Sequence, residues 1–337
     1  MPTLTVQEIY RLAYEALRRC GASDRQATPT AESIADAEAE GIPNVGLRYL
    51  PTYCEHLLCE KVVGSAVPTV TSVEGAITKV NAGNGFSHPA FVIGREQLVR
   101  LARANGIAAM VISHSYSAGV LGWFVDALAR QGLIGFCFAN SSSLVAPVGG
   151  LRPFFGTNPM AFAIPRANSE PVVLDLSTSA TAWVNVNEAA QSGRPIPPEW
   201  AQDSDGNPTT DAAAGLAGSI RPLGGAKGFA LGLMVEVLAA GLSGGSWSFE
   251  SSSFGDNEGG PPDVGQLLIA ISPAIADSQG GGFGTRLETL IEALLNEGDD
   301  VRLPGDRRLA FRKDATKNGI EVPDDLIALI SAMGVRR

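Results

Sequence analysis

Two short apolar runs follow a glycine- and proline-rich loop in the middle of the chain. The loop covers residues 149–159, and the runs are Met160–Ile164 and Val172–Leu176. Runs of five mainly apolar residues bounded by turn residues are typical of buried strands. The second run leads into Ser177, Thr178 and Ser179, whose hydroxyls and turn amides suit phosphate or carboxylate oxygens. The pattern predicts a polar ligand site at a sheet edge, although two core strands with an ordinary polar turn explain it equally well.

The length and composition describe a globular protein with more than one lobe. The chain has 337 residues, of which 45% are hydrophobic and 18% are charged. That balance fits a folded globular protein, and a chain of this length exceeds one small core, so we expect two lobes. The formal net charge of −10 argues against nucleic acid or an anionic membrane as a partner.

The chain carries four cysteines without a Cys-x-x-Cys pair: Cys20, Cys54, Cys59 and Cys137. Their apolar or helical surroundings predict buried free thiols in a reducing compartment. No apolar segment follows a basic start, and no apolar run approaches the length of a membrane span. We therefore expect a cytoplasmic protein.

Strand and helix patterns alternate along the chain after an all-helical opening. Apolar residues near helical spacing make residues 1–68 a helical region. Beyond it, strands are predicted at residues 69–80, 108–113, 132–139 and 160–164, with helices between them. This alternation predicts an α/β fold with a mixed or partly parallel sheet, whose functional groups lie on loops at the strand ends.

Several polar motifs have both a functional and a structural interpretation. Lys227 lies in a glycine-rich segment just before an apolar helix, where a helix N-terminus can hold an anion. Asp203 opens a turn that resembles a metal loop but lacks the downstream bidentate glutamate, which favours a surface turn. His88, at the start of a predicted helix, fits a capping or surface histidine. Residues 304–308 predict a tight turn with basic side chains.

Several spaced motifs, in one order over essentially the whole chain, carry a resemblance to a known family. They are Gly149-Gly150, Gly156-Thr-Asn-Pro159, Asp175-Leu-Ser-Thr-Ser179, Asp203-x-Asp-Gly206, Pro222-Leu-Gly-Gly-x-Lys-Gly228 and Pro304-Gly-Asp306. Together they resemble the non-Rossmann malate/L-lactate dehydrogenase family. Within it, the Δ1-piperideine-2-carboxylate/Δ1-pyrroline-2-carboxylate reductases look most similar, through Phe155-Gly-Thr-Asn-Pro159 and residues 244–249 and 265–273.

The resemblance implies a homodimer with a mixed-sheet α/β fold that binds NADPH or NADH, with the active site near the subunit interface. It divides the chain into three parts. Residues 1–68 form a helical region that packs with the C-terminal segment, and residues 69–245 form the cofactor-binding α/β domain. Residues 246–337 provide a strand and helices that return to the N-terminal lobe.

The resemblance also assigns the cofactor to a set of loops spread along the chain. The implied cofactor-binding residues are Asn140, Ser141, Thr157, Asp175, Leu176, Ser177, Thr178, Ser179, Lys227, Gly228, Gly305 and Asp306. Arg307 or Arg308 could meet a 2′-phosphate, which would favour NADPH, and a solvated turn explains these arginines equally well. No metal is implied.

Two departures from the family pattern fall on its histidines. The early Ser-His-Gly motif falls on Asn44-Val45-Gly46, and the arginine three residues after that glycine falls on Tyr49, with Arg48 one place away. The later Ser-Asn-His-Phe-Gly motif falls on Ser115-Tyr-Ser-Ala-Gly119. Both family histidines are therefore replaced, by Val45 and Ser117.

These replacements favour one substrate class. Reduction of a ketone leaves an alkoxide that needs a proton donor, commonly a histidine near its ordinary pKa. A cyclic imine that binds already protonated becomes a neutral amine on hydride addition and needs no donor in that step. We therefore predict NAD(P)H-dependent reduction of Δ1-pyrroline-2-carboxylate or Δ1-piperideine-2-carboxylate to L-proline or L-pipecolate.

Four residues are predicted to meet this substrate. Arg48 would bind its carboxylate bidentately. Asn44 and Ser117 would hydrogen-bond it. Asp203 would stabilise the iminium, unless it only shapes its surface turn.

Two other hypotheses fit the same residues. A 2-hydroxy-acid dehydrogenase of the malate or lactate type could recruit another acid or base, such as His114 or Tyr116. Alternatively, a homologue that binds the cofactor but has lost catalysis would serve as a binding or regulatory protein.

Overall fold

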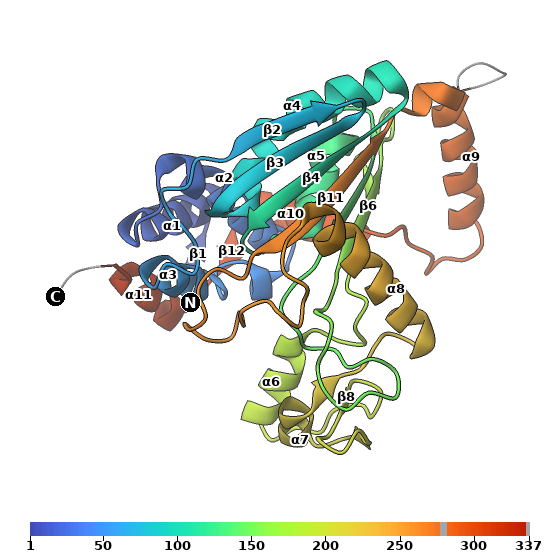
Figure 1. Cartoon of the computed structure of the whole chain (residues 1–337). Helices are drawn as coiled ribbons and strands as arrows, with labels where there is room; N and C mark the ends of the chain where they lie inside the picture. Colours follow the sequence, from blue (N-terminus) through green and yellow to red (C-terminus); the bar gives the residue numbers. More distant parts are fainter. Residues whose placement is uncertain (277–281, 335–337) are drawn as a thin grey trace.

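The computed structural model describes residues 1–276 and 282–334. A seven-stranded sheet forms its centre, in the order β2-β3-β4-β11-β5-β6-β7 (Figure 1). The strands are β2 (Thr69–Glu74), β3 (Ile77–Gly85), β4 (Ile107–Ser115), β5 (Ile134–Ala139), β6 (Met160–Ile164), β7 (Val172–Leu176) and β11 (Val264–Ile271). Only β3 and β4 pair in parallel, and all other neighbours are antiparallel. The predicted α/β fold with a mixed sheet is confirmed.

Side chains along each strand alternate between two helical layers. Met110 and Ile112 of β4 join a core with α4 (Ser87–Asn105) and α5 (Leu121–Ala129) on one face. Val111 points to the opposite face and joins Val235 of α8 (Ala226–Glu236), which continues as a π-helical segment, Val237–Gly241. This period of two explains why the strands read as continuous apolar runs, because both faces are covered.

The N-terminal helices and the C-terminal end of the described chain form one lobe beside the sheet (Figure 1). The elements are β1 (Thr3–Leu4), α1 (Val6–Arg19), α2 (Asp24–Ala39), α3 (Leu50–Leu58), α10 (Asp306–Asn318), β12 (Ile320–Glu321) and α11 (Asp324–Ala332). Strand β1 pairs with β12, α11 contacts α1 and α3, and α10 packs on α2. Thr5 and Glu8 form a capping box that fixes the start of α1.

A smaller lobe lies below α8, at the bottom of Figure 1. It contains α6 (Trp183–Gln191), β8 (Ala201–Gln202), β9 (Pro208–Thr209), α7 (Ala212–Ala217) and β10 (Ser219–Ile220). Val186, Ile196 and Ala212 belong to its own apolar cluster. Helix α9 (Gly282–Leu295) stands at the right of Figure 1 and packs Leu287 and Ile291 against β7.

Three local predictions were wrong. The strand predicted over residues 69–80 is a hairpin, because Gly75 adopts φ 59° and reverses the chain between β2 and β3. Residues 304–308 are not only a turn, since α10 begins at Asp306 directly after Gly305. All four cysteines, which lie in the described residues, are free thiols, but Cys59 is exposed. No helix in the described residues is long and apolar enough to cross a membrane.

Candidate functional site

The first replaced histidine position lies in a short 3₁₀ turn, Pro43–Val45, between α2 and α3. The next residue, Gly46, packs so closely on Glu38 that any side chain there would overlap its carboxylate. That carboxylate accepts the backbone N–H of Leu47 at 2.6 Å, and burial raises its pKa. Glu38 therefore holds the turn in place. Asn44, within the turn, has a buried Oδ1 with no hydrogen-bond partner within the described residues.

Arg48 leaves the same segment and reaches across to the smaller lobe. Its Nη1 lies 3.2 Å from Oε1 of Glu188 on α6, and both side chains are about half exposed. Arg48 also lines a pocket of about 470 Å³ together with Glu38 and Phe311. Exposed ion pairs contribute little stability. The guanidinium can therefore exchange Glu188 for a substrate carboxylate at small cost.

The second replaced histidine position, Ser117, lies just beyond the end of β4. Its hydroxyl accepts the N–H of Gly119 at 3.3 Å, and its carbonyl accepts the hydroxyl of Ser87 at 3.2 Å. Gly119 has φ 61°, and a Cβ there would lie 3.3 Å from Oη of Tyr53 and 3.9 Å from the imidazole of His88. This loop therefore rests directly on two buried polar side chains.

Tyrosines connect the two replaced positions. The Tyr53 ring contacts Tyr49 edge-on, with centroids 4.9 Å apart, and contacts Tyr116 edge-on at 5.8 Å. Tyr53 also lies beneath the Ser117 loop, since a Cβ on Gly119 would be 3.3 Å from its Oη. Helix α3, which follows the segment with Asn44 and Arg48, therefore packs beside the loop that carries Ser117.

The tautomer of His56 decides which atom donates in its hydrogen bond with Tyr116. Its Nε2 lies 2.9 Å from the carbonyl of Asp256, which only accepts, so Nε2 carries the proton of the neutral ring. Burial lowers the pKa of His56. Its Nδ1 therefore accepts the hydroxyl of Tyr116, whose pKa is raised well above its ordinary value by burial. Tyr116, one of the two alternative acid/base residues, has its proton engaged with His56.

The other alternative, His114, occupies an exposed position with φ 50° at the end of β4. Its Nδ1 lies 2.9 Å from a carboxylate oxygen of Asp263. The two side chains are 47% and 29% exposed, and Asp263 is also in the left-handed region. The pair holds β4 to the start of β11 from the solvent side.

The loops after β5 and before β6 bring together the first predicted cofactor residues. Asn140 accepts the N–H of Gly265 at 2.9 Å and donates to the carbonyl of Ser246 at 3.0 Å. Gly156 packs against Ser141 too closely for any other residue, and the Ser141 hydroxyl is buried without a partner in the described chain. An orphaned hydroxyl beside a side-chain-free backbone leaves a donor for a ligand oxygen.

The segment after β7 joins this loop to the start of α8. Thr178 donates its N–H and its hydroxyl to the carbonyl of Thr157, at 3.0 and 3.1 Å. Its own carbonyl accepts the N–H of Leu223 at 2.9 Å. Gly228 then packs on the backbone of Leu223, where a side chain would overlap it. The first turn of α8, with exposed Lys227, is therefore joined through Leu223 to the segment after β7.

The remaining members of this segment differ in their surroundings. Ser179 donates to the hydroxyl of Ser177 at 2.9 Å or to the carbonyl of Thr181 at 2.8 Å. Leu176 is 39% exposed at the end of β7. The hydroxyls of Ser177 and Ser179 form one polar patch beside Thr178, as the sequence predicts for this strand end.

Asp175 connects three elements. Its Oδ2 accepts the N–H of Gly122, in the first turn of α5, at 2.8 Å and lies 3.7 Å from Nη1 of Arg308 on α10. Burial raises the pKa of Asp175, and Arg308 acts against that rise. Gly305, at φ 90°, begins α10 so close to β7 that a Cβ would lie 2.9 Å from the carbonyl of Val173.

The basic residues of this turn have different roles. Asp306 caps the turn by accepting the N–H of Leu303 at 2.8 Å. Arg308 is occupied by Asp175, although its buried Nη1 lacks a hydrogen bond within the described residues. Arg307 is exposed and has no ion pair in that part of the chain. Of the two arginines, Arg307 is the one available to an external phosphate.

Asp203 lies in the hairpin between β8 and β9. Its Oδ1 accepts the N–H groups of Asp205 and Asn207, at 3.0 and 2.9 Å. These bonds stabilise its own turn, as expected for an aspartate at the start of a turn. Its role toward a substrate stays a prediction. No group of three or more potential metal ligands occurs among the described residues.

Sequence reasoning missed a buried carboxylate. Glu236 of α8 has no ion pair within the described residues and instead accepts Nδ2 of Asn158 at 2.6 Å, and the N–H and hydroxyl of Ser248 at 2.6 Å each. These bonds hold Asn158 at φ 37° within the Gly-Thr-Asn-Pro motif. An acid within an apolar helix was the available signal, because such a group requires buried donors.

His88 was also misjudged. The expected capping or surface histidine is 1% exposed and stacks on Phe124 with ring centroids 5.2 Å apart. Neither ring nitrogen has a hydrogen-bond partner in the described chain. Burial lowers the pKa of His88 to about 3, so the ring beneath the Ser117 loop is neutral.

Comparisons with known proteins agree with this architecture. A model of the malate/L-lactate dehydrogenase family matches residues 4–331. The (2R)-3-sulfolactate dehydrogenase (NADP(+)) of Chromohalobacter salexigens is 42% identical over 334 residues, 99% of this chain and 98% of the relative. The Δ1-pyrroline-2-carboxylate/Δ1-piperideine-2-carboxylate reductase of Pseudomonas syringae pv. tomato is 41% identical over 328 residues, 95% and 94% of the two chains.

A solved structure extends the likeness to three dimensions. The crystal structure of Δ1-piperideine-2-carboxylate reductase from Pseudomonas syringae pv. tomato has a TM-score of 0.93 and 38% identity, covering 99% of this chain and 100% of that one. The fold and the family match define an oxidoreductase. The chain belongs to the malate/L-lactate dehydrogenase family, which confirms the resemblance drawn from its motifs.

The buried neutral state of His88 predicts a specific pH dependence of stability. Below its ordinary pKa of 6.5 the unfolded chain binds a proton at His88, whereas the folded chain does not until about pH 3. Protonation therefore favours unfolding as the pH falls between these limits. Relative to His88→Phe, the wild type should lose about 2 kcal/mol of unfolding free energy between roughly pH 7.5 and pH 5.

Urea unfolding curves of both proteins at the two pH values measure this difference, and shared titrations of other groups cancel in it. Equal pH dependence in wild type and His88→Phe would show that His88 is not held neutral by burial.

Proposed function

We propose that this protein uses NAD(P)H to reduce a small cyclic ketimine acid, Δ1-pyrroline-2-carboxylate or Δ1-piperideine-2-carboxylate, to L-proline or L-pipecolate. One observation carries the proposal: neither of the two positions where the family has histidines holds a side chain that can release a proton near neutral pH. Val45 and Ser117 take those positions, His88 and His56 are kept neutral by burial, and Tyr116 donates to His56.

The chemistry of an imine suits such a site. Hydride addition to a ketone carbon puts negative charge on oxygen, and a nearby acid must neutralise it. Hydride addition to the carbon of a protonated imine moves the C=N electron pair onto nitrogen and leaves a neutral secondary amine. The protein then has to orient the substrate and balance its carboxylate, without supplying a proton in that step.

Named residues supply these tasks. Arg48 releases the carboxylate of Glu188 and binds the carboxylate of the substrate, so that one carboxylate replaces another. The unpartnered Oδ1 of Asn44 accepts the iminium N–H, and the Ser117 hydroxyl provides a further hydrogen bond. The carboxylate of Asp203 would stabilise the positive charge of the iminium.

The cofactor residues fit a dinucleotide. The orphaned hydroxyl of Ser141, the glycine backbone at Gly156 and the first turn of α8 with Lys227 offer donors to phosphate oxygens. Asp175, Gly305 and Asp306 lie together at the end of β7. The reduced nicotinamide supplies the hydride when it is bound.

We propose NADPH as the preferred form, with NADH possible. Arg307 is exposed and without an ion pair in the described chain, so it can meet a 2′-phosphate. One relative carries NADP(+) in its name. Arg308 is already committed to Asp175 and serves the fold of α10.

A second function has its own support. The relative that is 42% identical is named a 3-sulfolactate dehydrogenase, which acts on a 2-hydroxy acid. If this chain shares that activity, another acid/base is needed, with His114 as the candidate whose proton is not engaged by the Tyr116 cluster. The two functions are separated by substrate.

The chain also presents a surface suited to a second copy of itself. Leu231, Leu233, Met234 and Val237 are exposed on α8, from 36% to 49%. Contiguous exposed apolar side chains on one helix indicate a protein interface. We propose that α8 contributes to a homodimer interface.

Sedimentation velocity at micromolar concentration tests the dimer. The wild type should sediment as a dimer and Val237→Asp as a monomer, because the carboxylate would be buried without a partner. Val73→Asp is the matched control, since Val73 is 44% exposed on the edge strand β2. A monomeric wild type, or a dimeric Val237→Asp protein, would contradict the interface.

The substrate class is tested by NADPH oxidation with six compounds. We expect turnover of Δ1-pyrroline-2-carboxylate or Δ1-piperideine-2-carboxylate, and none above background with pyruvate, oxaloacetate, phenylpyruvate or 3-sulfopyruvate. The physical reason is the missing proton donor for an alkoxide. Turnover of oxo acids alone would refute the imine proposal and support the second function.

A pair of variants tests the cofactor site in the same assay. Lys227→Gln should raise the KM for NADPH roughly tenfold, because it removes one charge-assisted contact to phosphate. Lys79→Gln, which alters an exposed lysine of β3 paired with Glu74, should not change it. An unchanged KM in Lys227→Gln would remove Lys227 from the site.

A further inference from the structure

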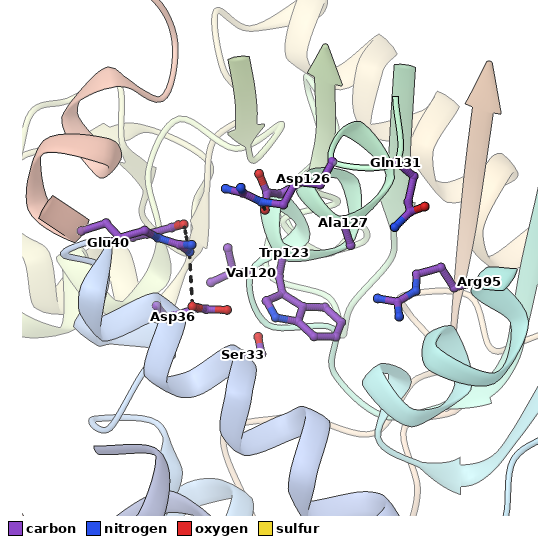
Figure 2. Close-up of a pocket in the computed structure, with 12 residues that line it drawn as sticks. Ser33, Asp36, Glu40, Arg95, Val120, Trp123, Asp126, Ala127 and Gln131 are labelled. Atoms are coloured by element: carbon purple, nitrogen blue, oxygen red, sulfur yellow. Dashed lines mark hydrogen bonds and ion pairs between the residues drawn. The ribbon is translucent and has the colours of Figure 1, made fainter. Parts of the chain in front are cut away.

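A charged pocket of about 310 Å³ lies between α2, α4, α5 and α10, and Figure 2 shows its walls. The lining residues with polar or aromatic side chains are Ser33, Asp36, Glu40, Arg95, Trp123, Asp126, Arg130, Gln131 and Arg312. A volume near 300 Å³ is at the lower end of small-ligand sites and equals about ten water volumes. None of these residues belongs to the predicted substrate or cofactor set.

One wall of the pocket has excess negative charge. Asp36 and Glu40 of α2 share a single guanidinium, that of Arg312, whose Nη2 lies 3.3 Å from Asp36 and 2.6 Å from Glu40. Burial raises the pKa of both carboxyl groups, and Arg312 only partly opposes that rise. Arg130 and Arg308 act on these carboxylates at longer range, but Arg312 is the one cation in ion-pair contact with them among the described residues, which leaves space for a second positive group.

The opposite wall offers positive charge and hydrogen-bond donors. Arg95 of α4 has no hydrogen bond or ion pair within the described residues; its guanidinium carbon lies 5.8 Å from the centre of the Phe91 ring, and its charge acts on Glu32 at longer range. The side-chain amide of Gln131 is also without a hydrogen bond there. Figure 2 shows Arg95 and Gln131 directed into the pocket from the side away from Asp36 and Glu40.

The centre of the pocket is apolar. The indole of Trp123 lies between the two charged walls in Figure 2 and contacts His88 edge-on, with centroids 5.3 Å apart. The third acidic side chain, Asp126, is already matched by Arg130 at 2.6 Å. A ligand therefore meets an anionic end, an aromatic ring and a cationic end in sequence.

We propose that this pocket is a second binding site, for a small zwitterionic amino acid. Its ammonium would lie on Asp36 and Glu40, its carboxylate on Arg95 and Gln131, and its carbon skeleton on Trp123. A free phosphate satisfies only the Arg95 end, and a simple cation satisfies only the α2 end. A molecule with both charges a few bonds apart satisfies both ends.

The products of the proposed reaction have this chemistry, because L-proline and L-pipecolate are zwitterions with a compact apolar ring. That pairing rests on the proposed function, whereas the site itself follows from the side chains. The pocket also adjoins the catalytic region, since Val120 lines it next to the Ser117 loop and Arg312 lies one helical turn after Arg308.

Calorimetric titration of the full chain with L-proline, without cofactor, tests the site. We expect a saturable heat in the wild type that weakens tenfold or more in Arg95→Gln and in Asp36→Asn, since each removes one charge-assisted contact. Prolinamide, which lacks the carboxylate, and N-acetyl-L-proline, which lacks the ammonium, should bind at least tenfold more weakly than L-proline. These ligand controls need no variant to fold.

Three protein controls separate this pocket from the catalytic site. Arg100→Gln makes the same substitution on α4 outside the pocket and should bind as the wild type does. Ser117→Ala should also keep the L-proline heat. Trp123→Phe, which keeps an aromatic ring but removes the indole, should lose any L-proline-induced change in tryptophan fluorescence.

Two results would overturn the proposal: no saturable heat up to tens of millimolar L-proline, or a heat that survives Arg95→Gln and Asp36→Asn but is lost in Ser117→Ala. The titration requires no turnover. Failure of ketimine reduction with the L-proline heat intact would therefore reject the proposed function and leave this site standing.

Discussion

The pairing of β11 with β4 on one side and β5 on the other determines where the functional loops lie. Strand β11 comes from the last third of the chain and completes the centre of the sheet. Its first residues hold both neighbours: Gln266 hydrogen-bonds buried Ser115 at 2.9 Å, and Gly265 donates to Asn140. The end of β4, which leads to Ser117, and the end of β5, which leads to Ser141, are thereby fixed on either side of β11.

Burial then sets the protonation states near this end of the sheet. His56 and His88 lie against aromatic rings, and burial lowers the pKa of both. Tyr116 donates a hydrogen bond to His56, and both groups stay neutral. The region around the two replaced histidine positions therefore contains neutral, mutually engaged groups, and Asn44 and Ser117 beside them have uncharged side chains. Such a site suits a substrate that brings its own positive charge.

The sequence predicted those parts of the fold that depend on local pattern. Strands β6 and β7 have the expected limits, Met160–Ile164 and Val172–Leu176, because turn residues flank short apolar runs. The hairpin at Gly75 was missed, since the apolar pattern continues across a turn that one glycine makes possible. The resemblance placed Thr157 and Thr178 among the cofactor-binding residues, and a hydrogen bond joins the two in the structure.

The rest depends on contacts between distant segments and is invisible in local pattern. His88 is buried because Phe124 and Trp123 of α5 pack against it. Arg48 has an ion-pair partner because Glu188 of α6 lies beside it. Periodicity cannot show which helix packs against which. Likewise, the pocket beside Trp123 exists only because α2, α4, α5 and α10 meet.

The central claim is that hydride reaches an already protonated imine without a proton from the protein. Isotope effects on kcat/KM, measured with NADPH deuterated at the transferred position and separately in D2O on the pH plateau, test it directly. We predict a primary isotope effect clearly above one and a solvent isotope effect close to one, because no proton moves in that transition state. A large solvent isotope effect on the same step would reveal a protein or water proton donor and contradict the account.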